Sequence, residues 1–148
     1  MKLKDQLAIV LYTTTKGHFG YKECYKHTIK RLRREIKDYD EFYKLAHIKI
    51  SEGENDVAAE MRSVLEADGF KVLETKGDWK HSAKDNSHAK EYFKDMLKAF
   101  SNGRLLFNHP LTLVLEDDQL LNFNRYNCLE NACDFLNEKT EALCVRIN

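Results

Sequence analysis

The chain has 148 residues, of which 43% are hydrophobic and 32% are charged, a composition typical of a globular protein. This length allows one domain with a substantial core and excludes two domains of ordinary size, so we expect a single domain over residues 1–148. Basic and acidic residues balance at 24 each, which excludes a net field that would draw the protein onto DNA or a membrane.

In chain order, strand-like and helix-like segments alternate. Apolar runs bounded by polar residues predict buried strands, and apolar residues at helical spacing predict amphipathic helices. The expected elements are a strand at 6–12, a helix at 21–38, a strand at 42–50, a helix at 57–68, a strand at 70–74, a loop at 75–87, a helix from 86 or 87 to 100, a strand at 111–115, a helix at about 124–136 and a strand at 142–147. This order predicts an α/β fold: one three-layer domain with a mostly parallel sheet and helices on both faces.

Two of the expected helices carry further details. Asn55 or Asp56 is placed to cap the helix at 57–68. The helix ending at 100 has its apolar residues on one side, which in an amphipathic helix is the side that packs on the core. These residues are Ala89, Tyr92, Phe93, Met96, Leu97 and Phe100.

The N-terminal sequence and the cysteines indicate the cellular compartment. The first residues lack the apolar core of a signal peptide, and the apolar run at 7–11 is too short to span a bilayer. We therefore expect a cytoplasmic protein with no membrane span. The cysteines form no C-x-x-C pair and are expected to be reduced core residues. They are Cys24, Cys128, Cys133 and Cys144. Abundant lysine, asparagine, tyrosine and phenylalanine with a single proline is typical of an AT-rich coding sequence such as that of a phage.

Three carboxylates, Glu116, Asp117 and Asp118, follow directly on the apolar strand at 111–115. Like charges this close repel one another unless they are solvated, cap a helix or share a divalent cation, and oxygen-rich clusters suit Mg²⁺ or Mn²⁺. In an open parallel sheet, ligands bind beyond the carboxyl ends of the strands. The segments at 13–18, 51–56 and 116–118 should therefore converge on one edge. Alternatively, the acids only solvate a loop or favour the start of the next helix.

Two familiar phosphate-binding motifs are absent from the sequence. The chain has no G-x-x-x-x-G-K-[ST] loop to accompany its acidic strand end. The first expected strand is not followed by G-x-G-x-x-G, since only Gly17 and Gly20 occur there. A P-loop enzyme is excluded and a classical dinucleotide fold is disfavoured.

The acidic run resembles a known family. The sequence from Leu113 to Asp118, followed by Leu120 and Leu121, is similar to the DxD region of GT-A glycosyltransferases, in the E-D-D version of N-acetylglucosaminyltransferase-like enzymes. The order of the upstream and downstream elements is similar over nearly the whole chain. The resemblance implies a domain that binds a nucleotide-diphosphate sugar, with a UDP-sugar favoured, and transfers the sugar to an acceptor that the sequence does not identify.

The resemblance also implies roles for the acids. Asp118 would bind Mn²⁺ or Mg²⁺, which bridges the two phosphates and neutralises charge on the leaving nucleoside diphosphate. Asp117 would orient the sugar or a metal-bound water, as a second residue of the metal site. Glu116 would approach the ribose.

Further positions of the donor site follow from the same resemblance. Thr13, Thr14 and Glu52 would line the base and ribose pocket, and His88 or Lys90 would meet the diphosphate. Each of these residues also has an ordinary structural interpretation, in a strand end, a turn or a helix surface.

The chain departs from the family after the acidic motif. The part that builds the acceptor site and supplies the catalytic base of inverting members has no counterpart, so no catalytic residue is assigned. Three explanations stay open: a minimal transferase completed by forming a homo-oligomer or larger assembly, a fragment of a longer protein, or a non-catalytic structural or interaction protein that retains the fold.

A nucleic-acid partner has one feature in its favour. The helix at 21–38 is rich in lysine and arginine, but it also carries Glu35 and Asp38. In a chain with no net charge, a solvated outer helix face is the favoured interpretation.

Overall fold

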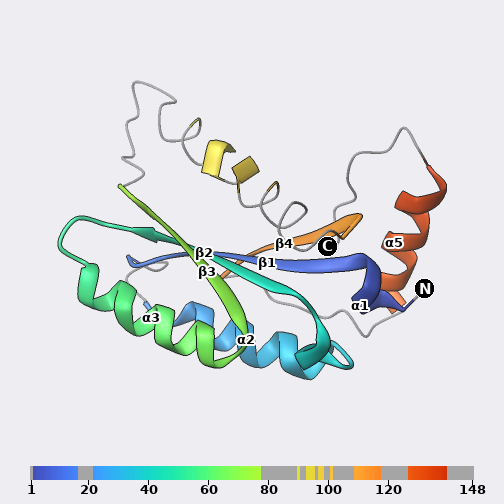
Figure 1. Ribbon diagram of the computed structural model, residues 1–148, viewed down its shortest axis with the longest axis horizontal. Helices are drawn as coiled ribbons and strands as arrows, with labels where there is room; N and C mark the ends of the chain where they lie inside the picture. Colours follow the sequence, from blue (N-terminus) through green and yellow to red (C-terminus); the bar gives the residue numbers. More distant parts are fainter. Residues whose placement is uncertain are drawn as a thin grey trace.

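The computed structural model describes residues 2–16, 22–77, 90, 93–95, 97–98, 101, 109–117 and 127–139. Within these residues the chain is an α/β fold built on a four-stranded sheet (Figure 1). The predicted fold class is confirmed. No helix in these ranges is both long and apolar enough to cross a membrane.

All four strands of the sheet are parallel, and their order is β3-β2-β1-β4. The strands are β1 (Leu7–Thr14), β2 (Lys44–Ile50), β3 (Phe70–Lys76) and β4 (Leu111–Glu116). Every residue of β1 and β2 is buried. Burial on both faces explains the apolar run of β1, whereas β2 buries Lys44, His47 and Lys49 among its apolar residues.

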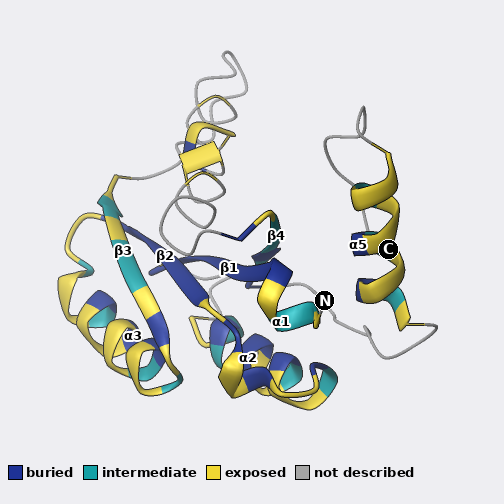
Figure 2. Ribbon diagram, turned by 45° about the vertical axis from the view of Figure 1, so that its right-hand side comes forward, coloured by how far each residue is buried: buried dark blue, intermediate teal, exposed yellow. Residues whose placement is uncertain are grey.

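Helices flank the sheet on both sides. The assigned helices are α1 (Leu3–Gln6), α2 (Cys24–Glu35), a 3-10 turn (Tyr39–Glu41), α3 (Asn55–Ala67) and α5 (Cys128–Glu138). α2 and α3 lie on one face (Figure 1), as right-handed crossovers running in the same direction require. The described residues between 90 and 101 are helical and lie on the opposite face (Figures 1 and 2). These layers match the predicted three-layer arrangement.

Among the described residues, the larger part of the core lies under α2 and α3. Leu11 and Ile48 of the sheet, Leu32 of α2 and Leu65 of α3 are fully buried there. Cys133 of α5 joins this core, and burial raises the pKa of its thiol to about 11. The other face has a smaller apolar cluster of Ala8, Val10, Tyr12 and Leu45.

Several element boundaries differ from the sequence prediction. β2 begins at Lys44 rather than 42, because Asp38 adopts a left-handed conformation with φ of +58° and the chain then forms a 3-10 turn. α3 begins at Asn55, and neither Asn55 nor Asp56 is its N-cap residue. The strand expected at 142–147 lies outside the described residues.

The predicted apolar side of the helix ending at residue 100 is wrong for the side chains that the structure describes. Phe93 and Leu97 point away from the sheet, with 64% and 52% of their surfaces exposed. Asp95 is buried against the sheet instead. The pattern therefore misplaced Phe93 and Leu97, because polar partners on the sheet bind Asp95.

Candidate functional site

The carboxyl ends of β1, β2 and β4 lie side by side. Thr14 of β1 pairs with Lys49 of β2, and Tyr12 of β1 pairs with Glu116 of β4. The residues that follow each strand therefore meet at one edge of the sheet. β1 and β4 are also the place where the strand order reverses, because the chain runs from β1 through β2 to β3 and then returns to the other side of β1.

Asp117 is buried at this edge, with 3% of its surface exposed. Its carboxylate accepts a hydrogen bond from the Thr13 hydroxyl, and Thr13 itself is 1% exposed. The backbone carbonyl of Asp117 accepts a bond of 2.6 Å from the Thr28 hydroxyl on α2, and its N–H donates to the Tyr12 carbonyl at 3.1 Å. These contacts fix the end of β4 against β1 and α2.

Glu116 lies on the opposite face of the sheet from Thr13 and Asp117. Successive residues of a strand point to opposite faces, and Glu116 pairs in register with Tyr12, whose side chain belongs to the second face. Glu116 is half-buried. Glu116 and Asp117 therefore do not converge on one ligand position.

A metal site therefore depends on Asp118, which lies outside the described residues. Within the described ranges, no group of three histidine, cysteine, aspartate or glutamate side chains is arranged to hold a metal ion. Of the predicted pair of metal ligands, Asp117 has its carboxylate engaged with Thr13. The role of Asp118 stays a prediction.

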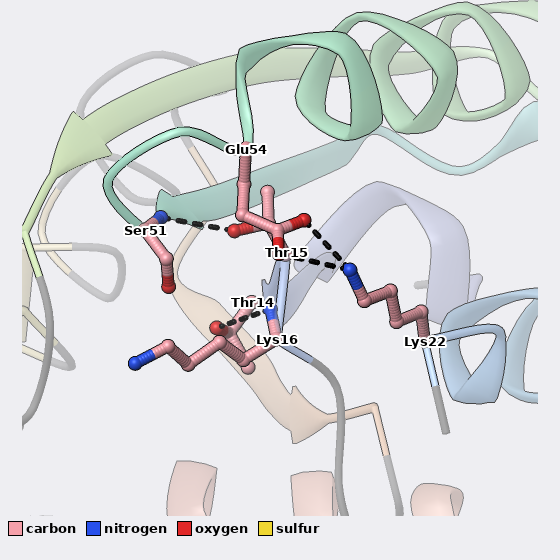
Figure 3. A network of polar contacts seen from close by, with 6 residues as sticks. All are labelled: Thr14, Thr15, Lys16, Lys22, Ser51 and Glu54. Carbon is pink, nitrogen blue, oxygen red and sulfur yellow. Dashed lines mark hydrogen bonds and ion pairs between the residues drawn. The ribbon is translucent and has the colours of Figure 1, made fainter. Parts of the chain in front are cut away.

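The chain after β1 is held to the chain after β2 by hydrogen bonds (Figure 3). The Thr15 hydroxyl accepts a bond of 2.9 Å from the Ser51 N–H, and the Thr15 N–H donates to the Lys49 carbonyl at 3.0 Å. The Thr14 hydroxyl accepts from the Lys16 N–H at 3.3 Å. Thr15 is fully buried. The sequence prediction named Thr13 and Thr14 but missed Thr15, which is the threonine that joins the two strand ends.

An ion pair closes the same region from the side of α2. The Lys22 ammonium contacts both carboxylate oxygens of Glu54, at 2.8 and 2.9 Å (Figure 3). Glu54 immediately precedes α3. The pair spans the segments that enter α2 and α3, so it ties together two of the turns that flank the edge.

A hollow of about 340 Å³ opens beside these turns, at the ends of β2 and β3. Predicted site residue Glu52 is exposed and lines it. Gly53, with φ of +77°, forms the turn and has open space around its α-carbon, so the backbone there is accessible. The hollow is lined by Ile50, Ser51, Glu52, Gly53, Asn55, Lys76 and Gly77.

Lys90 and His88 were the predicted diphosphate contacts. Lys90 is exposed on the helix that covers the second face of the sheet. His88 lies outside the described residues.

A buried polar cluster underlies the edge on the second face, and the sequence prediction did not find it. The Lys49 ammonium donates to the Asp95 carboxylate at 2.7 Å, and the Tyr12 hydroxyl donates to the same oxygen at 3.3 Å. Lys49 and Asp95 are both buried. The available signals were a lysine between two isoleucines of a strand and an aspartate inside an apolar helix pattern, which pair when the helix packs on the strand.

His47 and Tyr12 complete this cluster. Their rings meet edge to face with centroids 5.0 Å apart, and His47 Nε2 lies 2.8 Å from the Thr75 hydroxyl. Burial lowers the pKa of His47 to about 4. Burial, then Asp95, and lastly Glu116 raise the pKa of the Tyr12 hydroxyl far above its ordinary value. Both groups are therefore neutral at pH 7.

A second hollow, of about 400 Å³, lies at the opposite end of the sheet. Residues from the N-terminal segment, the end of α2 and the start of α5 line it, and none of them is a predicted site residue. They are Lys2, Leu3, Lys4, Glu35, Ile36, Lys37, Asp38, Phe42, Leu129 and Glu130.

Comparison of the chain with protein-family models, with curated proteins and with solved structures gives no match in any of the three.

Proposed function

We propose that this protein binds a nucleotide-diphosphate sugar at the carboxyl edge of its sheet, as the donor-binding domain of a GT-A-like glycosyltransferase. The observation that carries the proposal is the strand order, in which the acidic end of β4 lies next to the threonine-rich end of β1 at the reversal point of the sheet. In open α/β sheets this crevice is where ligands bind.

The contacts at the edge support a division of roles among the acids. Asp117, buried and bonded by Thr13, acts as a positioning residue that holds the end of β4. Asp118 is then the residue that binds Mn²⁺ or Mg²⁺, and a bound cation supplies the charge that neutralises the leaving diphosphate.

The hollow beside Glu52 supports a place for the rest of the donor. It lies on the side of β2 away from β4, and its rim carries both a carboxylate, Glu52, and an ammonium, Lys76. The diphosphate of a nucleotide held there would extend toward the point between β1 and β4 where the strand order reverses. The acceptor and the catalytic base stay unassigned.

Calorimetric titration of the full chain with a UDP-sugar, with and without Mn²⁺, tests this proposal. We expect binding in Mn²⁺ that is lost in chelator and weakened at least tenfold by Asp118→Asn. The matched control is Asp134→Asn, which neutralises an exposed aspartate on α5 and should leave binding unchanged. Binding that is independent of Mn²⁺ and of Asp118 would contradict the metal-dependent donor site.

The burial of Asp117 also favours a second candidate, a non-catalytic structural or interaction protein that retains this fold. With Asp117 bonded by Thr13 and Glu116 on the other face, the two described acids of the motif do not share a ligand position. This candidate predicts that no nucleotide sugar binds in the titration and that the chain associates stably with itself or with a partner in a sizing experiment.

A further inference from the structure

The helix on the second face of the sheet has a fixed orientation. Among the residues of this helix that the structure describes, Asp95 is the buried one, bonded by both Lys49 and Tyr12. At 3.6 residues per turn, positions 93 and 97 lie almost opposite position 95. The inward anchor therefore determines which side chains face outward.

The outward face combines exposed apolar and basic side chains. Phe93 and Leu97 are one turn apart and largely exposed. Lys90 and Lys94 follow on the flank of this face, one turn apart, and both are exposed. Neither of these lysines makes an ion pair with a residue in the described ranges. We call Lys90, Phe93, Lys94 and Leu97 the basic-apolar face.

We propose that the basic-apolar face binds an anionic lipid membrane surface. Exposed phenylalanine and leucine side chains gain free energy by leaving water for the acyl boundary of a bilayer, and lysines beside them extend their ammonium groups to lipid phosphates. The proposal concerns surface attachment and is independent of the proposed donor site. It gives a function to a face that core packing leaves uncovered.

A second copy of the chain fits this face less well. Two copies meeting here would bring their lysine rows together, which costs free energy by like-charge repulsion. Two apolar side chains also provide far less than the roughly 800 Å² that each partner of a stable interface buries. A membrane offers the opposite charge and an apolar layer at the same place.

Nucleic acid is also a weaker fit than lipid. Lysines would contact phosphates, but the exposed Leu97 would have no apolar surface to enter on a duplex backbone. The combination of both chemistries on one helix face favours the lipid surface.

Flotation of the full chain with vesicles tests the proposal. We expect binding to phosphatidylcholine vesicles that contain phosphatidylglycerol, at low ionic strength, and loss of that binding in high salt. The double variant Lys90→Gln, Lys94→Gln should weaken binding about 25-fold, from roughly fivefold for each lysine. The double variant Phe93→Ala, Leu97→Ala should weaken it at least tenfold.

The matched control variants change residues on other exposed surfaces of the protein. Lys30→Gln with Lys37→Gln removes two exposed lysines elsewhere, and Phe135→Ala removes an exposed apolar side chain of α5. Both controls should bind like the original chain. Circular dichroism of each variant checks that the fold is retained.

Three flotation results would overturn the proposal: no flotation with anionic vesicles, equal flotation with purely neutral vesicles, or unchanged flotation of both double variants. A dimer of the original chain that becomes a monomer in the Phe93→Ala, Leu97→Ala variant would also overturn it. Binding to an oligonucleotide without any binding to vesicles would likewise overturn it and identify a different partner.

Discussion

His47 is a buried histidine whose protonation opposes folding. Its Nε2 contacts Thr75, and its Nδ1 has no hydrogen-bond partner among the described residues. A second proton at Nδ1 would therefore be buried without an acceptor, which agrees with the lowered pKa of about 4. The ordinary pKa of about 6.5 applies in the unfolded chain.

The difference in pKa predicts how stability depends on pH. As pH falls below 6.5, the unfolded chain takes up a proton that the folded chain refuses, so folding stability is present above that pH and is lost toward pH 4. We expect the protein to lose about 2 kcal/mol relative to a His47→Gln variant between pH 7 and pH 5. Urea unfolding of both proteins at several pH values measures this difference.

The matched control for this pH effect is His27→Gln, because His27 is exposed on α2. This control should follow the pH dependence of the original chain. If His47→Gln also follows it, protonation of His47 does not limit stability and the ring is hydrated in solution.

At the same scale, the acidic triplet shows what sequence could not provide. The apolar run at 111–115 predicted that these acids follow a strand. It could not predict the faces to which Glu116 and Asp117 point, because those faces depend on the register of β4 on β1. The hydroxyl of Thr13, more than one hundred residues away in sequence, decides that Asp117 is buried.

Among elements, the helix on the second face depends on a buried ion pair. Lys49 and Asp95 are each less than 10% exposed at the side chain. Removing one charge leaves the other buried without compensation, which typically costs about 3–5 kcal/mol. We expect Lys49→Met to lower the free energy of unfolding by that amount, as measured by urea denaturation.

A double variant separates loss of charge balance from loss of packing. Lys49→Met with Asp95→Asn leaves no buried charge and keeps an acceptor for the Tyr12 hydroxyl, so it should recover most of the stability lost in the single variant. If Lys49→Met alone costs less than about 1 kcal/mol, as an exposed pair would, the pair is solvated and does not hold the helix.

The elements themselves differ in how far their sequences determine them. β1 and β4 were predictable as strands from their runs of leucine, isoleucine and valine. β1 is buried on both faces as expected, but β4 is mostly half-buried. α2 was predictable from its helical spacing. The exposure of Phe93 and Leu97 was not predictable, because their hydrophobicity favours burial. The pairing of Asp95 with Lys49 and Tyr12 instead buries Asp95.

Across the whole molecule, the two faces of the sheet are held by different interactions. Among the described residues, α2 and α3 pack on a large apolar core, whereas the opposite helix is held by polar contacts of Asp95 with Lys49 and Tyr12, beside a smaller apolar cluster. Regions with few buried apolar contacts open at lower free energy than the core. The second-face helix should therefore open while the sheet stays folded.

Native-state hydrogen exchange tests this order of opening. We expect the amides of Lys94, Asp95 and Lys98 to exchange faster than those of Val10 and Leu11 in β1.

Leu11→Ala removes a fully buried side chain from the larger core and should lower the free energy of unfolding by about 2–5 kcal/mol. That loss should speed exchange in β1 at least 30-fold and leave the helix amides unchanged, because the helix opens without unfolding β1. Equal acceleration of the β1 amides and the helix amides would mean instead that the two faces unfold as one cooperative unit. The polar cluster would then stabilise the helix as strongly as the apolar core stabilises β1.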